Sequence, residues 1–223
     1  RLINFSLNRD NSQGVFTVAS DTSHLNDPDL LYSFDMKGGK PTLIMDTKEI
    51  HLEGDYRVRG GLAQPFNKGK YIMVSVTPKV PTPRRQKIEP DKSFELELWK
   101  WDDEISQSRQ RSERVSRPGE PRYVYHVDSK KCVLVAPSHM NNIYSPTCDE
   151  YNYVIIADET PYRKLTDWRD GNAADYYLVH LETGERKLVF SDLRDRPVWS
   201  PNGKYALFYH GKKKAWYKLN PVT

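Results

Sequence analysis

Short apolar and aromatic runs alternate with turn residues along most of the chain. Residues 15–19 (V-F-T-V-A) and 71–76 (Y-I-M-V-S-V) are such runs, and residues 94–101 (F-E-L-E-L-W-K-W) alternate apolar and polar positions except at the adjacent Leu98 and Trp99. Runs of this length, bounded by Gly, Pro, Asn and Asp, are typical of β-strands. Because no longer segment has a convincing helical period, the pattern predicts an all-β protein.

Several neighbouring runs predict β-hairpins. Residues 29–35 and 41–45 flank a Gly-Gly turn, and the E-T-G-E turn at residues 182–185 joins residues 176–181 to residues 186–190. Glycine accepts the positive φ that tight hairpin turns require. These pairs indicate antiparallel sheets built from strands that follow one another along the chain.

A turn that leads into an aromatic-rich strand recurs four times. The clearest copy is W-S-P-N-G-K-Y at residues 199–205, in which Pro presets φ while Asn and Gly accept positive φ. The other copies lie at residues 5–16, 63–74 and 144–155. Successive copies are offset by 58, 81 and 55 residues. The longest offset contains two insertions: a basic, proline-rich one at 78–91 and a charged one at 102–121.

Without these insertions the repeat has the size of a four-stranded β-propeller blade. We therefore expect residues 1–223 to form a single partial propeller domain. The expected blades are residues 1–60, 61–140, 141–195 and, in part, 196–223. Complete rings have roughly 4–8 blades, so about three and a half blades predict an incomplete ring. We expect the chain to be a fragment of a longer polypeptide, or to self-associate through its open blade edges.

Composition excludes several classes of protein. Aromatic residues make up 12% of the chain, which argues against disorder although only 37% of residues are apolar. No apolar run is long enough to span a membrane. The net charge of +4 comes from interspersed basic and acidic residues, so nucleic-acid binding is not supported.

The chain lacks the motifs of catalysis and of metal binding. No G-x-S-x-G is present, so there is no nucleophile elbow, and the six histidines lack metal-ligand spacing. Residues 167–175 carry three carboxylates but lack the closing Glu of an EF-hand. Cys132 and Cys148 could form one disulfide or none. We predict no catalytic residue, no metal site and no cofactor.

Two groups of side chains remain as candidate sites. His126 and His180 occupy the same place in their hairpins, where they would line a shared channel or pack against the next blade. Arginines in and after the 102–121 insertion would contact a partner domain, unless the insertion is a solvated loop. These arginines are Arg109, Arg111, Arg114, Arg117 and Arg122.

The tryptophans allow two interpretations. Trp99 and Trp101 have the same parity, so they would face one side of their strand, either as sugar-stacking platforms or as packing between blades. In the last blade we expect the core to contain Trp199, Phe208 and two further aromatic residues, Tyr205 and Trp216.

Two segments resemble known propellers. Residues 198–209 resemble the blade motif of TolB-like and prolyl oligopeptidase propellers. Residues 94–110 are similar to a strand and charged insertion in the N-terminal propeller of bacterial prolyl oligopeptidase (S9) family serine peptidases. The resemblance covers residues 60–223. In that family the propeller limits access to the Ser-His-Asp site of an α/β-hydrolase domain.

The resemblance implies a non-catalytic propeller portion of a larger S9-type serine peptidase. It would filter peptide substrates before they reach a hydrolase domain of the same polypeptide. Related bacterial peptidases are commonly exported, which implies a periplasmic or extracellular location. The alternatives are a stand-alone TolB-like module that binds a protein and a carbohydrate-binding propeller.

Overall fold

A computed structural model describes residues 2–19, 30–50, 52, 56–78, 100–104, 106–107, 120–140, 142–166 and 172–222. The strands are β1 (Leu2–Leu7), β2 (Gln13–Val18), β3 (Leu30–Asp35), β4 (Thr42–Asp46), β5 (Tyr56–Phe66), β6 (Tyr71–Pro78), β7 (Arg122–His126), β8 (Lys131–Ala136), β9 (Asn142–Tyr144), β10 (Tyr153–Asp158), β11 (Ala174–His180), β12 (Arg186–Leu193), β13 (Val198–Trp199), β14 (Ala206–His210) and β15 (Ala215–Leu219). Three short 3-10 helices accompany them, η3 (Ser138–Met140), η4 (Thr160–Leu165) and η5 (Gly211–Lys213).

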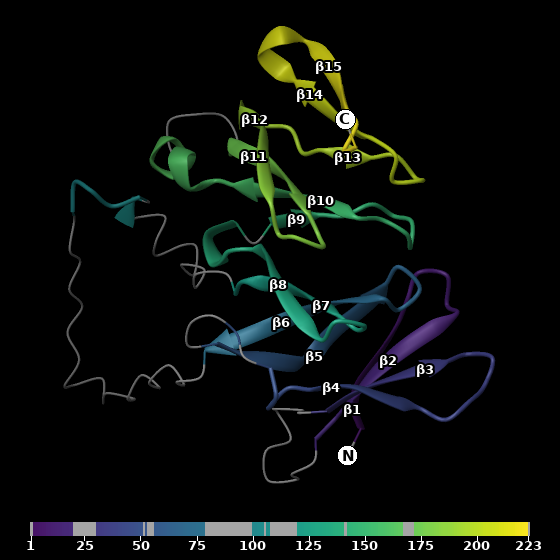
Figure 1. Ribbon diagram of the computed structural model, residues 1–223. Coiled ribbons are helices and arrows are strands. Elements are labelled where there is room, and N and C mark those ends of the chain that lie inside the picture. Colours follow the sequence, from purple (N-terminus) through teal and green to yellow (C-terminus); the bar gives the residue numbers. More distant parts are fainter. Residues whose placement is uncertain are drawn as a thin grey trace, which may run out of the picture.

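The strands form four successive antiparallel sheets, each made of strands that are adjacent in sequence. The first three sheets have four strands each, β1–β4, β5–β8 and β9–β12, and the fourth has three, β13–β15. Figure 1 shows the sheets following one another from the N-terminal to the C-terminal end. This up-and-down connectivity is that of propeller blades. The predicted all-β fold and the incomplete ring of about three and a half blades are confirmed.

The recurring turn has the same hydrogen bonds in the first and fourth sheets. The Ser200 amide donates to the Tyr205 carbonyl over 2.9 Å, and the Tyr205 amide donates to Ser200 Oγ over 3.1 Å. In the first sheet the Asn8 amide donates to the Gln13 carbonyl, and the Gln13 amide donates to Asn8 Oδ1. A short polar side chain at the start of the turn therefore satisfies the amide of the residue that enters the second strand.

Three separate apolar cores lie between successive sheets. Each sheet has a rear face, which packs on the preceding sheet, and a front face, which packs on the following one. The front face of the first sheet contributes Val15, Leu31 and Met45 to the first core, opposite Val74 and Tyr125 of the second sheet. The other two cores repeat this arrangement one sheet further along the chain. Apolar burial between sheets thus holds the stack together.

A pair of residues recurs on the rear face of every sheet. A residue of the second strand stands directly opposite a tyrosine of the third strand. The pairs are Phe16–Tyr32, Val74–Tyr123, Ile156–Tyr177 and Phe208–Tyr217. This repetition relates the four sheets more closely than the turn motif does, because it fixes which side chains face the preceding sheet.

Side-chain hydrogen bonds add polar contacts between sheets. Tyr125 donates its hydroxyl to the Ile44 carbonyl over 2.8 Å, which links the second sheet to the first. Trp199 donates Nε1–H to the Tyr144 carbonyl over 2.9 Å, which links the fourth sheet to the third. Both partners are backbone groups at strand positions, so these bonds also fix the register between sheets.

The prediction for the core of the last blade is correct at two positions and wrong at two others. Trp199 and Phe208 are buried, whereas Tyr205 is half-buried and Trp216 is 65% exposed. Trp216 stands opposite Tyr209 on the front face of the fourth sheet. Among the described residues no further sheet packs on that face, so this aromatic side chain stays in contact with solvent.

The two cysteines are unpaired, and the side chain of Cys132 is partly buried. Burial raises the pKa of Cys132 from 9.0 to about 12, so its neutral form is favoured in the folded state. The preference of the folded state for the neutral thiol contributes in full to the free energy of unfolding below about pH 9, and this contribution is lost as the pH rises toward 12.

We expect iodoacetamide at pH 8 to alkylate Cys132 of a Cys148→Ser variant roughly a thousandfold more slowly in the native state than in urea, because the thiolate is the reactive form. Mass spectrometry of quenched samples gives both rates. Comparable rates in the two states would contradict the buried thiol.

Candidate functional site

The first strands of three sheets meet at a cavity of about 500 Å³. Phe5 of β1, Gln64 of β5 and Ile143 of β9 contribute to its wall. Each of these strands is the first strand of its sheet and lies at one edge of it. Because these three edges come together at the cavity, they form the inner side of the arc. The remaining residues that line the cavity are Asn4, Ser6, Ala63, Phe66, Met73, Arg122, Ser145 and Tyr151. The cavity therefore occupies the place where a propeller has its channel.

The wall of this cavity combines apolar side chains with amide, hydroxyl and guanidinium groups. Arg122 begins β7, is half-buried, and donates from Nη1 to Ser75 Oγ of the neighbouring strand β6. Among the described lining residues, Arg122 carries the only positive charge. The cavity is thus suited to a ligand with both apolar groups and a hydrogen-bonding backbone.

Tyr151 supplies a neutral aromatic wall. Its ring stacks on Phe66 with centroids 4.8 Å apart. Burial raises the pKa of Tyr151 to about 12, so the hydroxyl remains protonated at neutral pH. The charge of the described wall at neutral pH is therefore set by Arg122.

The turns between the first and second strands of the first and third sheets contact each other beside the cavity. Arg9 of the first sheet donates from Nη2 to Ser145 Oγ over 3.3 Å and from Nη1 to the Pro146 carbonyl. Both acceptors precede β10 of the third sheet, so the guanidinium reaches past the second sheet. This contact fixes the distance between two of the three strands that line the cavity.

Asn67 fastens the turn of the second sheet to the third sheet. Its Nδ2 donates to the Tyr151 carbonyl over 2.9 Å, and its Oδ1 accepts from the Tyr151 amide over 2.6 Å. An ion pair of 2.6 Å between Lys68 and Glu150 lies beside these bonds but is largely exposed. The two hydrogen bonds between the Asn67 side chain and the Tyr151 backbone, rather than the ion pair, therefore position Tyr151 in the cavity wall.

The two predicted histidines do not meet in this cavity. His126 is buried, with Nε2 3.1 Å from the Leu181 carbonyl of the third sheet and its ring 4.7 Å from that of Tyr71. His180 makes the same kind of ring contact with Tyr153, at 4.8 Å. The position of His126 matches packing against the next blade, which the sequence offered as the second interpretation.

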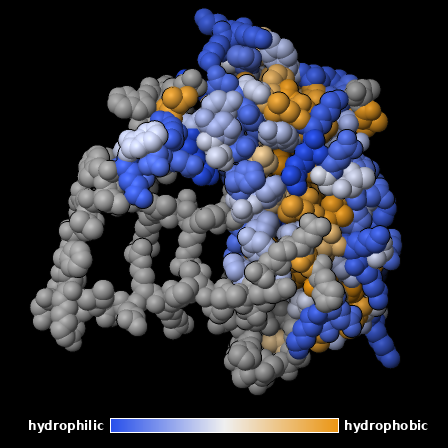
Figure 2. Space-filling view, turned by 60° about the vertical axis from the view of Figure 1, so that its left-hand side comes forward, coloured by the Kyte–Doolittle hydropathy of each residue, from blue (hydrophilic) through white to orange (hydrophobic). Residues whose placement is uncertain are grey.

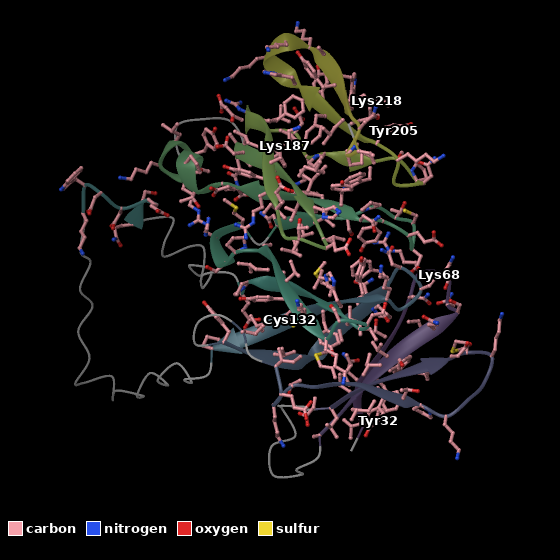
Figure 3. All side chains as sticks on the ribbon, viewed as in Figure 1. Tyr32, Lys68, Cys132, Lys187, Tyr205 and Lys218 are labelled. Atoms are coloured by element: carbon pink, nitrogen blue, oxygen red, sulfur yellow. The ribbon has the colours of Figure 1, made fainter. Side chains whose placement is uncertain are left out.

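His180 instead lines a second hollow, of about 680 Å³, between the third and fourth sheets. Its wall also includes Lys187 of β12 and Leu219 of β15. Figure 3 places the labelled Lys187 on the third sheet and Lys218 on the fourth. A channel-lining role for the two histidines stays a prediction.

The structure describes one of the five arginines that were predicted to contact a partner domain. Arg109, Arg111, Arg114 and Arg117 lie outside the described residues, whereas Arg122 lies in the cavity wall. The beginning of the same insertion contacts the third sheet, because Glu104 pairs with Arg163 of η4 at 3.3 Å. Trp101, which sequence parity placed on a strand with Trp99, lies in a turn and is 95% exposed.

Sequence reasoning missed most of the cavity wall. Ser6, Gln64 and Ser145 each occupy the second position of a copy of the recurring turn, and this shared position was the signal that could have brought them together. Arg9 lies inside the turn itself, where a charged residue is ordinary and gives no sequence signal.

In the part of the chain that the structure describes, no three His, Cys, Asp or Glu side chains form a group that could hold a metal ion. Residues 167–171 of the acidic segment lie outside that part. No helix among the described residues is long and apolar enough to cross a membrane.

Comparisons with known proteins find likeness in structure but not in sequence. No family model matches the chain, and no curated protein matches it. Solved structures do resemble it. One of two prolyl endopeptidases shares 13% identity with a TM-score of 0.46, over 94% of this chain and 28% of that chain.

The β-propeller domain of the Trilobed protease from Pyrococcus furiosus shares 9% identity with a TM-score of 0.45, over 98% of this chain and 55% of that chain. TolB from Acinetobacter baumannii shares 12% identity with a TM-score of 0.36, over 97% of this chain and 40% of that chain. This chain thus spans between about a quarter and about half of the length of these proteins. What they have in common with it is a propeller fold, at identities too low to indicate more.

Proposed function

We propose that this chain is the non-catalytic propeller portion of a larger S9-type serine peptidase. In that role it filters peptides on their way to an α/β-hydrolase domain of the same polypeptide. The observation that carries the proposal is the cavity on the inner side of the arc, with side chains from β1, β5 and β9 in its wall. Amide and hydroxyl groups beside aromatic rings suit an extended peptide, whose backbone needs hydrogen-bond partners at every residue.

The similarity of residues 94–110 to the insertion of bacterial S9 propellers supports this choice of family. The ion pair between Glu104 and Arg163 brings the start of the insertion to η4 of the third sheet. We propose that the insertion and its arginines meet the hydrolase domain at that end of the sheets. The same resemblance implies export from the cell.

The test uses the natural full-length gene product. A fluorophosphonate probe should label a serine outside residues 1–223, because these residues contain no nucleophile elbow. Failure to label any serine would overturn the peptidase assignment and would favour a stand-alone TolB-like module that binds a protein.

Filtering is tested in the same full-length protein with a Phe5→Ala variant, which removes a 63% exposed ring from the cavity wall. We expect kcat/KM for a peptide of about 30 residues to rise roughly threefold to tenfold relative to that for a tripeptide. Leu188→Ala is the control, because Leu188 lies on β12 and does not line the cavity. This variant should leave the ratio of the two kcat/KM values unchanged. An equal change for both substrates would argue against a filter.

A further inference from the structure

The cavity between the first three sheets differs in charge from the outer surface of the molecule. On the face that Figure 2 shows, hydrophilic side chains (blue) surround scattered apolar patches (orange). Charged residues make up 29% of the chain, but Arg122 is the only charged one among the described residues that line the cavity. An ionic ligand in the cavity would therefore meet one positive charge and, among these residues, no negative charge.

The position of Arg122 is fixed by the neighbouring strand. Arg122 stands opposite Ser75 in the pairing of β6 with β7, and its Nη1 donates to Ser75 Oγ. Ser75 is only 1% exposed, so its hydroxyl is an anchor within the protein rather than a surface group. Met73 lies two residues before Ser75, on the same face of β6, and also lines the cavity. The bond to Ser75 therefore holds the guanidinium beside the cavity.

Most of the guanidinium of Arg122 is available to a ligand. A guanidinium carries five N–H donors, and Ser75 Oγ accepts from one nitrogen of Arg122. Among the described residues, no carboxylate forms an ion pair with this half-buried arginine. Arg9 is used differently, because its Nη1 and Nη2 both donate to groups of the third sheet. A partly desolvated guanidinium without a counter-charge favours the binding of an anion.

The rest of the described wall offers neutral groups to such an anion. Burial raises the pKa of Tyr151 to about 12, so its hydroxyl carries no charge at neutral pH. Ser6 and Gln64 add a hydroxyl and an amide, and Phe66 adds an apolar ring. A carboxylate would therefore meet the guanidinium without repulsion from another carboxylate of these residues.

We propose that Arg122 binds a carboxylate of the peptide that enters the cavity. The carboxylate has two sources, the free C-terminus of the peptide and an acidic side chain, and a guanidinium can bind both oxygens of either. The inference rests on the proposed function, because it takes the cavity to be a site for peptides. It adds a selection by charge to the selection by size. A C-terminal carboxylate also marks a free chain end, which an internal loop of a folded protein lacks.

Equilibrium binding to the natural full-length protein tests this inference. The protein is first treated with the fluorophosphonate probe, so that bound peptides are not cleaved. The peptide Ala-Phe-Ala-Ala carries an uncharged N-terminal fluorophore and ends either in a free carboxylate or in an amide. Fluorescence anisotropy gives the two dissociation constants. We expect the carboxylate form to bind about tenfold more tightly than the amide.

A third peptide distinguishes the two sources of the carboxylate. Ala-Phe-Glu-Ala amide, with the same fluorophore, has a carboxylate only on its side chain. If it binds as weakly as the uncharged amide while the free acid binds tightly, Arg122 recognises the C-terminus. If it binds more tightly than the uncharged amide, Arg122 accepts acidic side chains.

Three variants assign the effect to the guanidinium of Arg122. Arg122→Gln keeps a donor for Ser75 but removes the charge, so the free acid and the amide should bind equally. Arg122→Lys keeps the charge without the planar fork and should retain a preference of about threefold. Arg163→Gln is the matched control, because Arg163 lies on η4 and does not line the cavity. It should keep the full preference. Circular dichroism melting checks that the variants are folded.

Three results would overturn the inference. The unaltered protein could bind neither carboxylate peptide more tightly than the uncharged amide. The preference could persist in Arg122→Gln, which would place the carboxylate elsewhere. It could be lost equally in Arg163→Gln, which would indicate a general effect of charge. The proposed function fails by a different observation, the absence of a labelled serine, whereas the ratio of affinities is measured without any reactive serine.

Discussion

Replacing Phe208 by alanine should lower the free energy of unfolding by about 3–5 kcal/mol. Phe208 is fully buried between the third and fourth sheets, with its ring centroid 4.5 Å from that of Phe190 and 5.8 Å from that of Tyr176. Alanine would leave a cavity lined by these rings, and among the described residues the three-stranded fourth sheet contributes to no other core. Urea unfolding followed by circular dichroism measures the change.

Trp101→Ala is the control for this prediction. It also removes a large aromatic side chain, but one that is 95% exposed, so the free energy of unfolding should change by no more than about 0.5 kcal/mol. Equal losses in the two variants would contradict the packing of Phe208 in the third core.

Replacing Asn67 by alanine should lower the free energy of unfolding by about 2–4 kcal/mol. The change removes both side-chain bonds to the Tyr151 backbone and leaves that amide and carbonyl without their partner. It also places alanine at φ +50°, a left-handed conformation that asparagine adopts more readily than alanine does. Because Tyr151 lines the cavity, the variant should also weaken any peptide binding there.

Two further variants separate these causes. Asn67→Gly loses the same hydrogen bonds but tolerates positive φ, so it should be about 1 kcal/mol more stable than Asn67→Ala. Glu150→Ala removes only the exposed ion pair with Lys68 and should cost at most about 1 kcal/mol. If Glu150→Ala lowered the free energy of unfolding as much as Asn67→Ala, the hydrogen bonds of the Asn67 side chain would not be the contact that joins the two turns.

The strands that alternate clearly in sequence could be predicted, and those that depend on pairing could not. β6, β10 and β14 contain runs of apolar and aromatic residues, and the structure has them as strands. β5 contains the sequence R-V-R-G-G, which local preference places in a loop. It becomes a strand by pairing with β6, across a shift in register between Arg59 and Gln64.

Parity along a strand shows which residues share a face, but not what covers that face. Trp216 alternates correctly with its neighbours and was therefore expected in the core, yet its face has no described neighbour. Parity likewise could not show that His126 contacts the carbonyl of Leu181, which lies 55 residues further along the chain. The cavity could not be predicted for the same reason, since its walls come from three sheets.

The division of the apolar interior into three cores makes the protein behave as a linear array. Among the described residues each sheet packs on its immediate neighbours, and Arg9 also contacts the third sheet. In such an array, stability is close to a sum of the stabilities of single repeats and of the interfaces between neighbouring repeats. Gain or loss of one terminal repeat would therefore change the length of the arc while leaving the remaining interfaces intact. Chains of this type can consequently evolve by whole repeats.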